Sequence, residues 1–127
     1  VGDVPYMRAA EMYLIEAEAL ARAGQNGPAQ DVLFELASAR DDAYTKSTST
    51  GQTLINEILI QRRIELWGEG FRWYDLKRLN LPLDRTGANH VALVIDSKFE
   101  EPAGSDDWQF KIPIDELNAN EFMVQNP

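Results

Sequence analysis

Two glutamates, Glu65 and Glu69, lie four residues apart in a segment with a helical pattern, so they share one helix face. A hydrolase can use two carboxylates as general acid and general base. Arg62 and Arg72 flank this pair, however, and a nearby positive charge keeps a carboxylate ionised instead of raising its pKa as a general acid requires. The pattern therefore predicts structural ion pairing and no catalytic residue.

The surrounding segment, residues 61–78, mixes charges of both signs with large aromatics and two glycines. A simple surface helix separates charged and apolar faces, so charges spread around a helix must be paired where they contact protein. On a helix Arg62 stands next to Glu65, and Glu69 follows on that face. Asp75 is three residues from both Arg72 and Arg78. We predict that these side chains form ion pairs that hold two helices together.

Other groups that could carry chemistry are isolated. His90 is the only histidine, and no nucleophile is arranged around it. The acidic pairs at 41–42, 100–101 and 106–107 lack the spacing of a calcium loop, which favours solvated loop charge. Residues 68–70 lack the further glycines of a phosphate-binding loop. The sequence therefore predicts no catalytic residue, no metal site and no cofactor.

Aromatic side chains are the remaining candidates, because sugars are often held on flat aromatic faces. Trp73, Tyr74 and Trp108 could serve in this way. The helical context predicts that Trp67 and Trp73 are core residues. Trp108 follows acidic loop residues and is the best surface candidate for a ligand contact, although packing is the favoured interpretation of it as well.

The elements that must position these residues are mainly helices. Apolar spacing predicts helices over about 5–23, from Pro28 onward, 54–67 and 71–79, which form two tetratricopeptide-like hairpins. The first helix is apolar around much of its circumference, including a second row with Met12 and Ile15, so it is expected to be sandwiched between neighbours.

From Asn80 onward glycines and prolines interrupt the chain, and short strands are predicted at 91–95 and 108–112. This irregular segment, about 80–127, is expected to wrap back onto the helical hairpins at about 4–79. The prediction is one mainly α domain over residues 1–127.

Three segments also resemble one protein family in the same order. The run Arg-Arg-Ile-Glu-Leu-Trp-Gly-Glu-Gly-Phe-Arg-Trp-Tyr-Asp-Leu-Lys-Arg at 62–78 resembles a signature of the SusD/RagB family. The run Arg-Ala-Ala-Glu-Met-Tyr-Leu-Ile-Glu-Ala-Glu-Ala at 8–19 precedes it, and Trp-Gln-Phe-Lys-Ile-Pro-Ile-Asp-Glu-Leu-Asn from Trp108 follows, with Val-Gln-Asn-Pro at the end. The residues carried over as structural signature are Arg62, Arg63, Glu65, Glu69, Gly70, Arg72, Asp75 and Arg78.

The resemblance implies the C-terminal portion of a longer outer-membrane nutrient-binding lipoprotein. Such proteins bind glycans or oligopeptides without transforming them and work with a SusC-type TonB-dependent transporter. The export signal and lipid anchor would belong to a missing N-terminal part, which is the only membrane attachment expected. The resemblance assigns no ligand-binding residue.

Composition excludes several classes of partner and chemistry. The formal charge is −9, from 21 acidic and 12 basic residues, which argues against a nucleic-acid partner and against docking on anionic lipids. Cysteine is absent, which excludes disulfide and thiol chemistry. The sequence contains no run of about 18 apolar residues, the length needed to span a bilayer. Two alternatives remain open: a helical-repeat adaptor that binds another protein, and a fragment of a glycoside hydrolase that uses Glu65 and Glu69.

Overall fold

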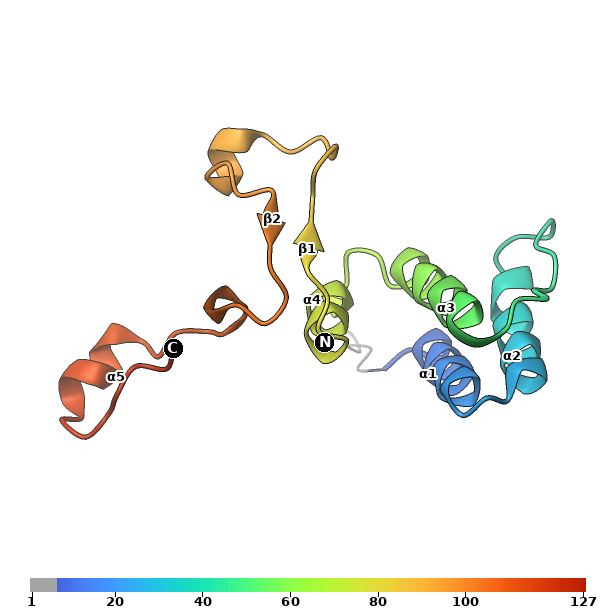
Figure 1. The fold of residues 1–127 in the computed structure, drawn as a ribbon, viewed down its shortest axis with the longest axis horizontal. Helices are drawn as coiled ribbons and strands as arrows, with labels where there is room; N and C mark the ends of the chain where they lie inside the picture. Colours follow the sequence, from blue (N-terminus) through green and yellow to red (C-terminus); the bar gives the residue numbers. More distant parts are fainter. Residues whose placement is uncertain (1–6) are drawn as a thin grey trace, which may run out of the picture. The chain divides into compact units, whose positions relative to one another are not determined.

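The computed structural model describes residues 7–127, and the chain divides into two compact units, Val1–Phe71 and Arg72–Pro127. The first unit is helical, and the second combines short helices with a two-stranded sheet (Figure 1). The mainly α fold with a small strand content is therefore confirmed. The boundary between these two units lies at 71–72, inside the predicted second hairpin. The single domain over residues 1–127 stays a prediction.

The first unit contains α1 (Ala9–Arg22), α2 (Asn26–Ser38) and α3 (Gly51–Glu65). A short turn joins α1 to α2, and α3 lies against both (Figure 1). Gly24 takes a φ of +78° in this turn, a conformation that glycine adopts without the steric cost of a side chain. The start predicted at residue 5 falls partly outside the described residues, and within them α1 begins at Ala9.

The core of the first unit consists of large aliphatic side chains separated by alanines. Leu14, Leu33, Leu54 and Ile58 are fully buried and come from all three helices. The buried alanines on α1 and α2 have no side chain beyond Cβ, so the helix backbones can approach closely; they are Ala10, Ala17, Ala21, Ala29 and Ala37. The face of α1 that the 3–4 spacing predicted to be buried is therefore the face that packs.

The second apolar row of α1 is not buried in this unit. Met12 and Ile15 are each about half exposed. The expectation that α1 is sandwiched on both sides is therefore wrong for the described residues. The row is apolar in sequence, but the two partners of α1 both cover its other face.

The polar connection between α2 and α3 is fixed by side chains. The Tyr44 hydroxyl donates to Glu57 at 2.8 Å, and Gln30 donates to the carbonyl of Ser49 at 2.8 Å. Burial, together with the hydrogen bond to Glu57, raises the pKa of Tyr44 well above its usual value, so its hydroxyl keeps its proton. These bonds hold a loop that carries few apolar residues.

The second unit contains α4 (Phe71–Arg78) except for its first residue, β1 (Leu83–Asp84), β2 (Glu100–Glu101) and α5 (Ile114–Ala119). It also has 3-10 turns at Ala92–Ile95 and Asp106–Trp108. The strands pair antiparallel, with Leu83 opposite Glu101 and Asp84 opposite Glu100 (Figure 1). Leu76 of α4 and Trp108 are the large apolar side chains buried in this unit.

Both predicted strands are wrong. Residues 91–95 contain a 3-10 turn, because Asp96 and Ser97 take left-handed backbone conformations that reverse the chain directly after it. In the segment 108–112, Trp108 ends the second 3-10 turn. The backbone nitrogen of Ile112 donates to the side chain of Gln125 and not to a neighbouring strand. Short apolar runs fit strands and turns equally well, so periodicity alone could not separate them.

No helix within residues 7–127 is long and apolar enough to cross a membrane.

Candidate functional site

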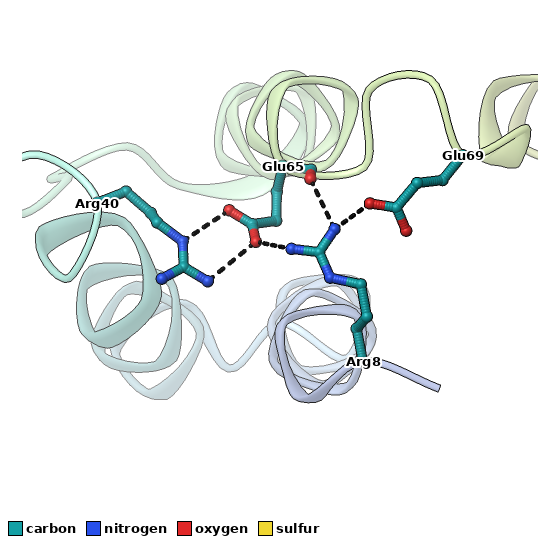
Figure 2. Close-up of polar contacts among 4 residues, drawn as sticks. All are labelled: Arg8, Arg40, Glu65 and Glu69. Carbon is teal, nitrogen blue, oxygen red and sulfur yellow. Dashed lines mark hydrogen bonds and ion pairs between the residues drawn. The ribbon is translucent and has the colours of Figure 1, made fainter. Parts of the chain in front are cut away.

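Glu65 and Glu69 of the family signature pair with arginines from distant parts of the first unit. Figure 2 shows Arg8, Arg40, Glu65 and Glu69 in one network. Arg40 donates two hydrogen bonds to the Glu65 carboxylate, both at 3.0 Å. Nη2 of Arg8 donates to Oε1 of the same carboxylate at 2.5 Å. Glu65 thus receives a planar two-pronged contact from one arginine and a further contact from another, which fixes its orientation.

The helix ends position this network. Arg8 stands immediately before α1, Arg40 lies two residues after α2, and Glu65 is the last residue of α3. Arg8 also donates to the backbone carbonyl of Glu65 at 3.2 Å and to the carboxylate of Glu69. The last carbonyls of a helix have no partner within it, so Arg8 satisfies one of them as well as pairing both acids (Figure 2).

The two arginines keep Glu65 ionised. The hydrogen bond from Arg40 is the main cause that holds the pKa of Glu65 below its usual range, and the charges of Arg40 and Arg8 act in the same direction against partial burial. A general acid needs the opposite shift. The geometry is therefore that of an ion-pair joint between three helix ends, and it is unsuited to proton donation.

This arrangement predicts an acid-sensitive contribution to stability. The pKa of Glu65 is depressed in the folded chain, so its contribution is complete above the ordinary value of 4.5 and is lost as the pH falls through the lower folded value. Glu65→Gln is expected to lower the free energy of unfolding by about 1–2 kcal/mol at neutral pH, a modest loss because both arginines are partly exposed.

Urea titrations between about pH 3 and pH 7 measure this contribution. The difference between the wild type and Glu65→Gln should shrink as the pH falls below 4.5. Glu16→Gln, on the exposed side of α1, is the matched control and should leave the curve unchanged. A difference that stays constant over the whole pH range contradicts the ion-pair assignment.

Arg62 makes a separate contact with α1. Its side chain is 7% exposed and donates to Glu11 at 3.2 Å, while its guanidinium lies 5.2 Å from the centre of the Phe71 ring. A buried arginine is tolerated where a carboxylate and an aromatic face compensate its charge. The sequence placed Arg62 beside Glu65, whereas Glu11 is an acid that it meets among the described residues.

In the second unit Asp75 and Arg78 pair as their spacing predicts. Arg78 donates to the Asp75 carboxylate at 2.8 Å, and the Asp75 side chain is 4% exposed. Arg72 lies on the same helix, in its first turn. Gly70 precedes α4 with a φ of +83°, and it has open space around its Cα, so the backbone conformation and not crowding favours glycine there.

Three residues of these ion pairs escaped the sequence argument: Arg8, Glu11 and Arg40. Arg8 and Glu11 lie within the segment 8–19 that resembles the family, but nothing in their spacing indicates which acid or base they meet. Arg40 lies outside all three segments. Their partners are 25 to 61 residues away, and such contacts leave no local periodicity.

The aromatic residues divide differently from the prediction. Trp67 is 86% exposed, so its assignment to the core is wrong. Trp108 is 4% exposed, and its indole nitrogen donates to the carbonyl of Pro102 at 2.6 Å. Its ring centre lies 4.8 Å from that of Trp73. Trp108 is therefore a packing residue here, and its face is not open as a platform for a sugar.

The segment that begins at Trp108 contacts the Val-Gln-Asn-Pro at the end of the chain. The side-chain amide of Gln125 accepts from the backbone nitrogen of Ile112 at 2.9 Å and donates to its carbonyl at 3.1 Å. Asn126 donates to the carbonyl of Phe110 at 3.2 Å. The polar end of the chain therefore supplies the backbone partners that a second strand would otherwise provide.

The remaining candidates carry no built site. His90 lies in a loop, exposed, before the first 3-10 turn. Lys98 forms ion pairs with Glu101 and Asp107. One acid from each of the acidic pairs 100–101 and 106–107 therefore belongs to a local ion network. Across residues 7–127 no group of three or more histidine, cysteine or acidic side chains is arranged to hold a metal ion.

Comparison with known proteins decides the family. A model of the SusD family matches residues 2–127. The chain belongs to the SusD family. A SusD-like protein of Formosa agariphila, named P38, is 35% identical over an aligned stretch of 93 residues, which covers 67% of this chain and 18% of that protein. The chain thus spans less than a fifth of the length of this SusD-like relative. No solved structure matches the chain.

Proposed function

We propose that the polypeptide to which these residues belong is a non-catalytic nutrient-binding protein of the outer membrane. It captures glycans or oligopeptides at the cell surface and passes them to a SusC-type TonB-dependent transporter. The observation that carries this proposal is the SusD family match, which extends over nearly the whole chain. A lipid anchor in another part of the polypeptide supplies the attachment to the membrane.

The charged residues support a scaffold role within that function. Glu65 and Glu69, the acids that a glycosidase could use, are both tied to Arg8, and Glu65 is held ionised by Arg40 as well. A retaining or inverting glycosidase needs one protonated carboxyl group. The ion pairs therefore favour a passive structural joint over hydrolysis by this pair.

The proposal is tested on the intact polypeptide with soluble oligosaccharides and peptides as ligands. Calorimetry should detect binding of one ligand class, and the ligand should be recovered unchanged after long incubation. Co-purification from membranes should yield a TonB-dependent transporter, whose gene is expected beside this one. The proposal is contradicted if the polypeptide binds no oligosaccharide and no peptide. It is also contradicted if the polypeptide is purified from membranes and no transporter accompanies it.

Glu65→Gln and Glu69→Gln separate binding from hydrolysis. Both variants of the intact polypeptide are expected to bind within about twofold of the wild type, because neither carboxylate needs to exchange a proton. Chromatography of the oligosaccharide after incubation measures cleavage directly. Cleavage by the wild type that either substitution abolishes would establish the hydrolase alternative instead.

A further inference from the structure

The side chain of Asn26 is hydrogen-bonded to a helix other than its own. Asn26 is the first residue of α2, and its Oδ1 accepts from the backbone nitrogen of Gly51, the first residue of α3, at 2.9 Å. The first N–H groups of a helix have no acceptor within it, and the residue just before the helix usually supplies one. Thr50, which precedes α3, makes no such bond from its side chain. Asn26 therefore caps α3 from 25 residues away.

Asn26 is also the first half of an asparagine–glycine pair. Gly27 follows it directly, and no other asparagine of the sequence precedes a glycine. In such a pair the backbone nitrogen of the glycine can attack the side-chain carbonyl carbon of the asparagine. Glycine has no Cβ, so its nitrogen is unhindered and the chain reaches the required conformation more easily than with any other residue. The residue that caps α3 is thus the asparagine of this chain most prone to deamidation.

The reaction needs water and no other reagent. The Gly27 nitrogen forms a bond to Cγ of Asn26, the bond from Cγ to Nδ2 breaks, and ammonia leaves with the proton that the Gly27 nitrogen gives up. Water then opens the five-membered imide. Breaking the new bond to Cγ leaves aspartate, whereas breaking the original peptide bond leaves isoaspartate, in which the backbone runs through Cγ. Nothing is oxidised or reduced in either branch.

The fold leaves the reacting groups accessible. Gly27 is exposed and lies in the first turn of α2, where its N–H has no acceptor within the helix. Gln25, the residue before α2, makes no capping bond from its side chain. Nδ2 of Asn26 donates to the carbonyl of Gly24 at 3.3 Å, a long and exposed bond that water can replace. Helix ends fray, so release of one terminal residue brings the two groups together without unfolding the protein.

We propose that Asn26 is a site of covalent self-modification in the folded protein, and that the product decides how firmly the start of α3 is held. Aspartate keeps an oxygen for the Gly51 N–H and adds negative charge near two helix N-termini, where it is stabilising. Isoaspartate lengthens the backbone by a carbon and shortens the carboxylate side chain, so the cap is lost. The proposal concerns the first unit and does not depend on which nutrient or transporter the protein binds.

Peptide mapping of the intact polypeptide by mass spectrometry tests the reaction. After incubation at mildly alkaline pH, position 26 of the native protein is expected to deamidate at least about tenfold faster than the same position in Gly27→Ala. Gly27→Ala is a matched control because a Cβ there meets open space and the backbone is not left-handed, so the fold is retained. Equal rates in the two proteins, or an amide that stays intact in the native wild type, overturn the proposal.

Hydrogen exchange at the Gly51 amide, read by NMR, tests the consequence. Asn26→Ala removes the acceptor and is expected to speed the exchange of this amide at least about fivefold. Asn26→Asp should keep the amide protected, whereas aged protein rich in isoaspartate should exchange as fast as Asn26→Ala. Equal exchange in the wild type and Asn26→Ala overturns the proposal, as does protection that survives conversion to isoaspartate.

Discussion

Replacing Leu14 by alanine is expected to lower the free energy of unfolding by about 2–5 kcal/mol, which is the largest effect among single substitutions considered for this chain. Leu14 is fully buried in the cluster where α1 meets α2 and α3. Removing its side chain leaves a cavity that the surrounding helices can fill only in part. Urea denaturation followed by circular dichroism at the helix band measures the loss.

Ile15→Ala is the matched control for this substitution. Ile15 is the next residue on α1 and is about half exposed, so its truncation removes a side chain of the same size from outside the buried face of the helix. The expected loss is below about 1 kcal/mol. Equal losses for Leu14→Ala and Ile15→Ala would mean that the packing of α1 is not the one described.

Asp75→Ala is expected to destabilise the chain by about 2–4 kcal/mol, because it removes the carboxylate that compensates Arg78 inside the second unit. The Asp75 side chain is 4% exposed and that of Arg78 is 41% exposed, so the arginine can regain part of its hydration. This keeps the expected loss below that of a fully buried pair. Thermal unfolding followed by tryptophan fluorescence is a suitable measurement, since Trp73 lies on the same helix.

Asp42→Ala provides the comparison for this result. Asp42 is an exposed loop residue of the same type, and its loss should change the stability by no more than about 0.5 kcal/mol. Asp75→Asn adds a second test, because the amide keeps the shape of the side chain and removes its charge. A loss for Asp75→Ala that matches Asp42→Ala would show that the ion pair does not hold the unit together.

The ion pairs distribute the family signature over two different structural tasks. Glu65 and Glu69 join α3 and the turn after it to the N-terminal end of α1, and Glu65 also reaches Arg40 beyond α2. Asp75 and Arg78 instead act within the second unit. A segment that looks continuous in sequence thus fastens three helix ends in one unit and stabilises a short helix in the other.

Local patterns in the sequence determined the helices and the inner face of the first hairpin. The 3–4 spacing of apolar residues on α1, the glycine turn after it and the helical character of residues 71–78 all follow from interactions within a few residues, which spacing records directly. The same is true of the Asp75–Arg78 pair, whose partners are three residues apart. The family was also readable, because it is carried by ordered local motifs.

Only the tertiary structure decided which long-range partners these residues have. Glu65 was predicted to meet Arg62 along one helix, yet its partners here are Arg8 and Arg40, while Arg62 lies against Glu11 and Phe71. Such pairings depend on how helix ends converge after the core has packed, and no spacing along the chain encodes that. Burial of Trp108 and exposure of Trp67 were hidden for the same reason: a large apolar side chain faces the interior only where another element covers it.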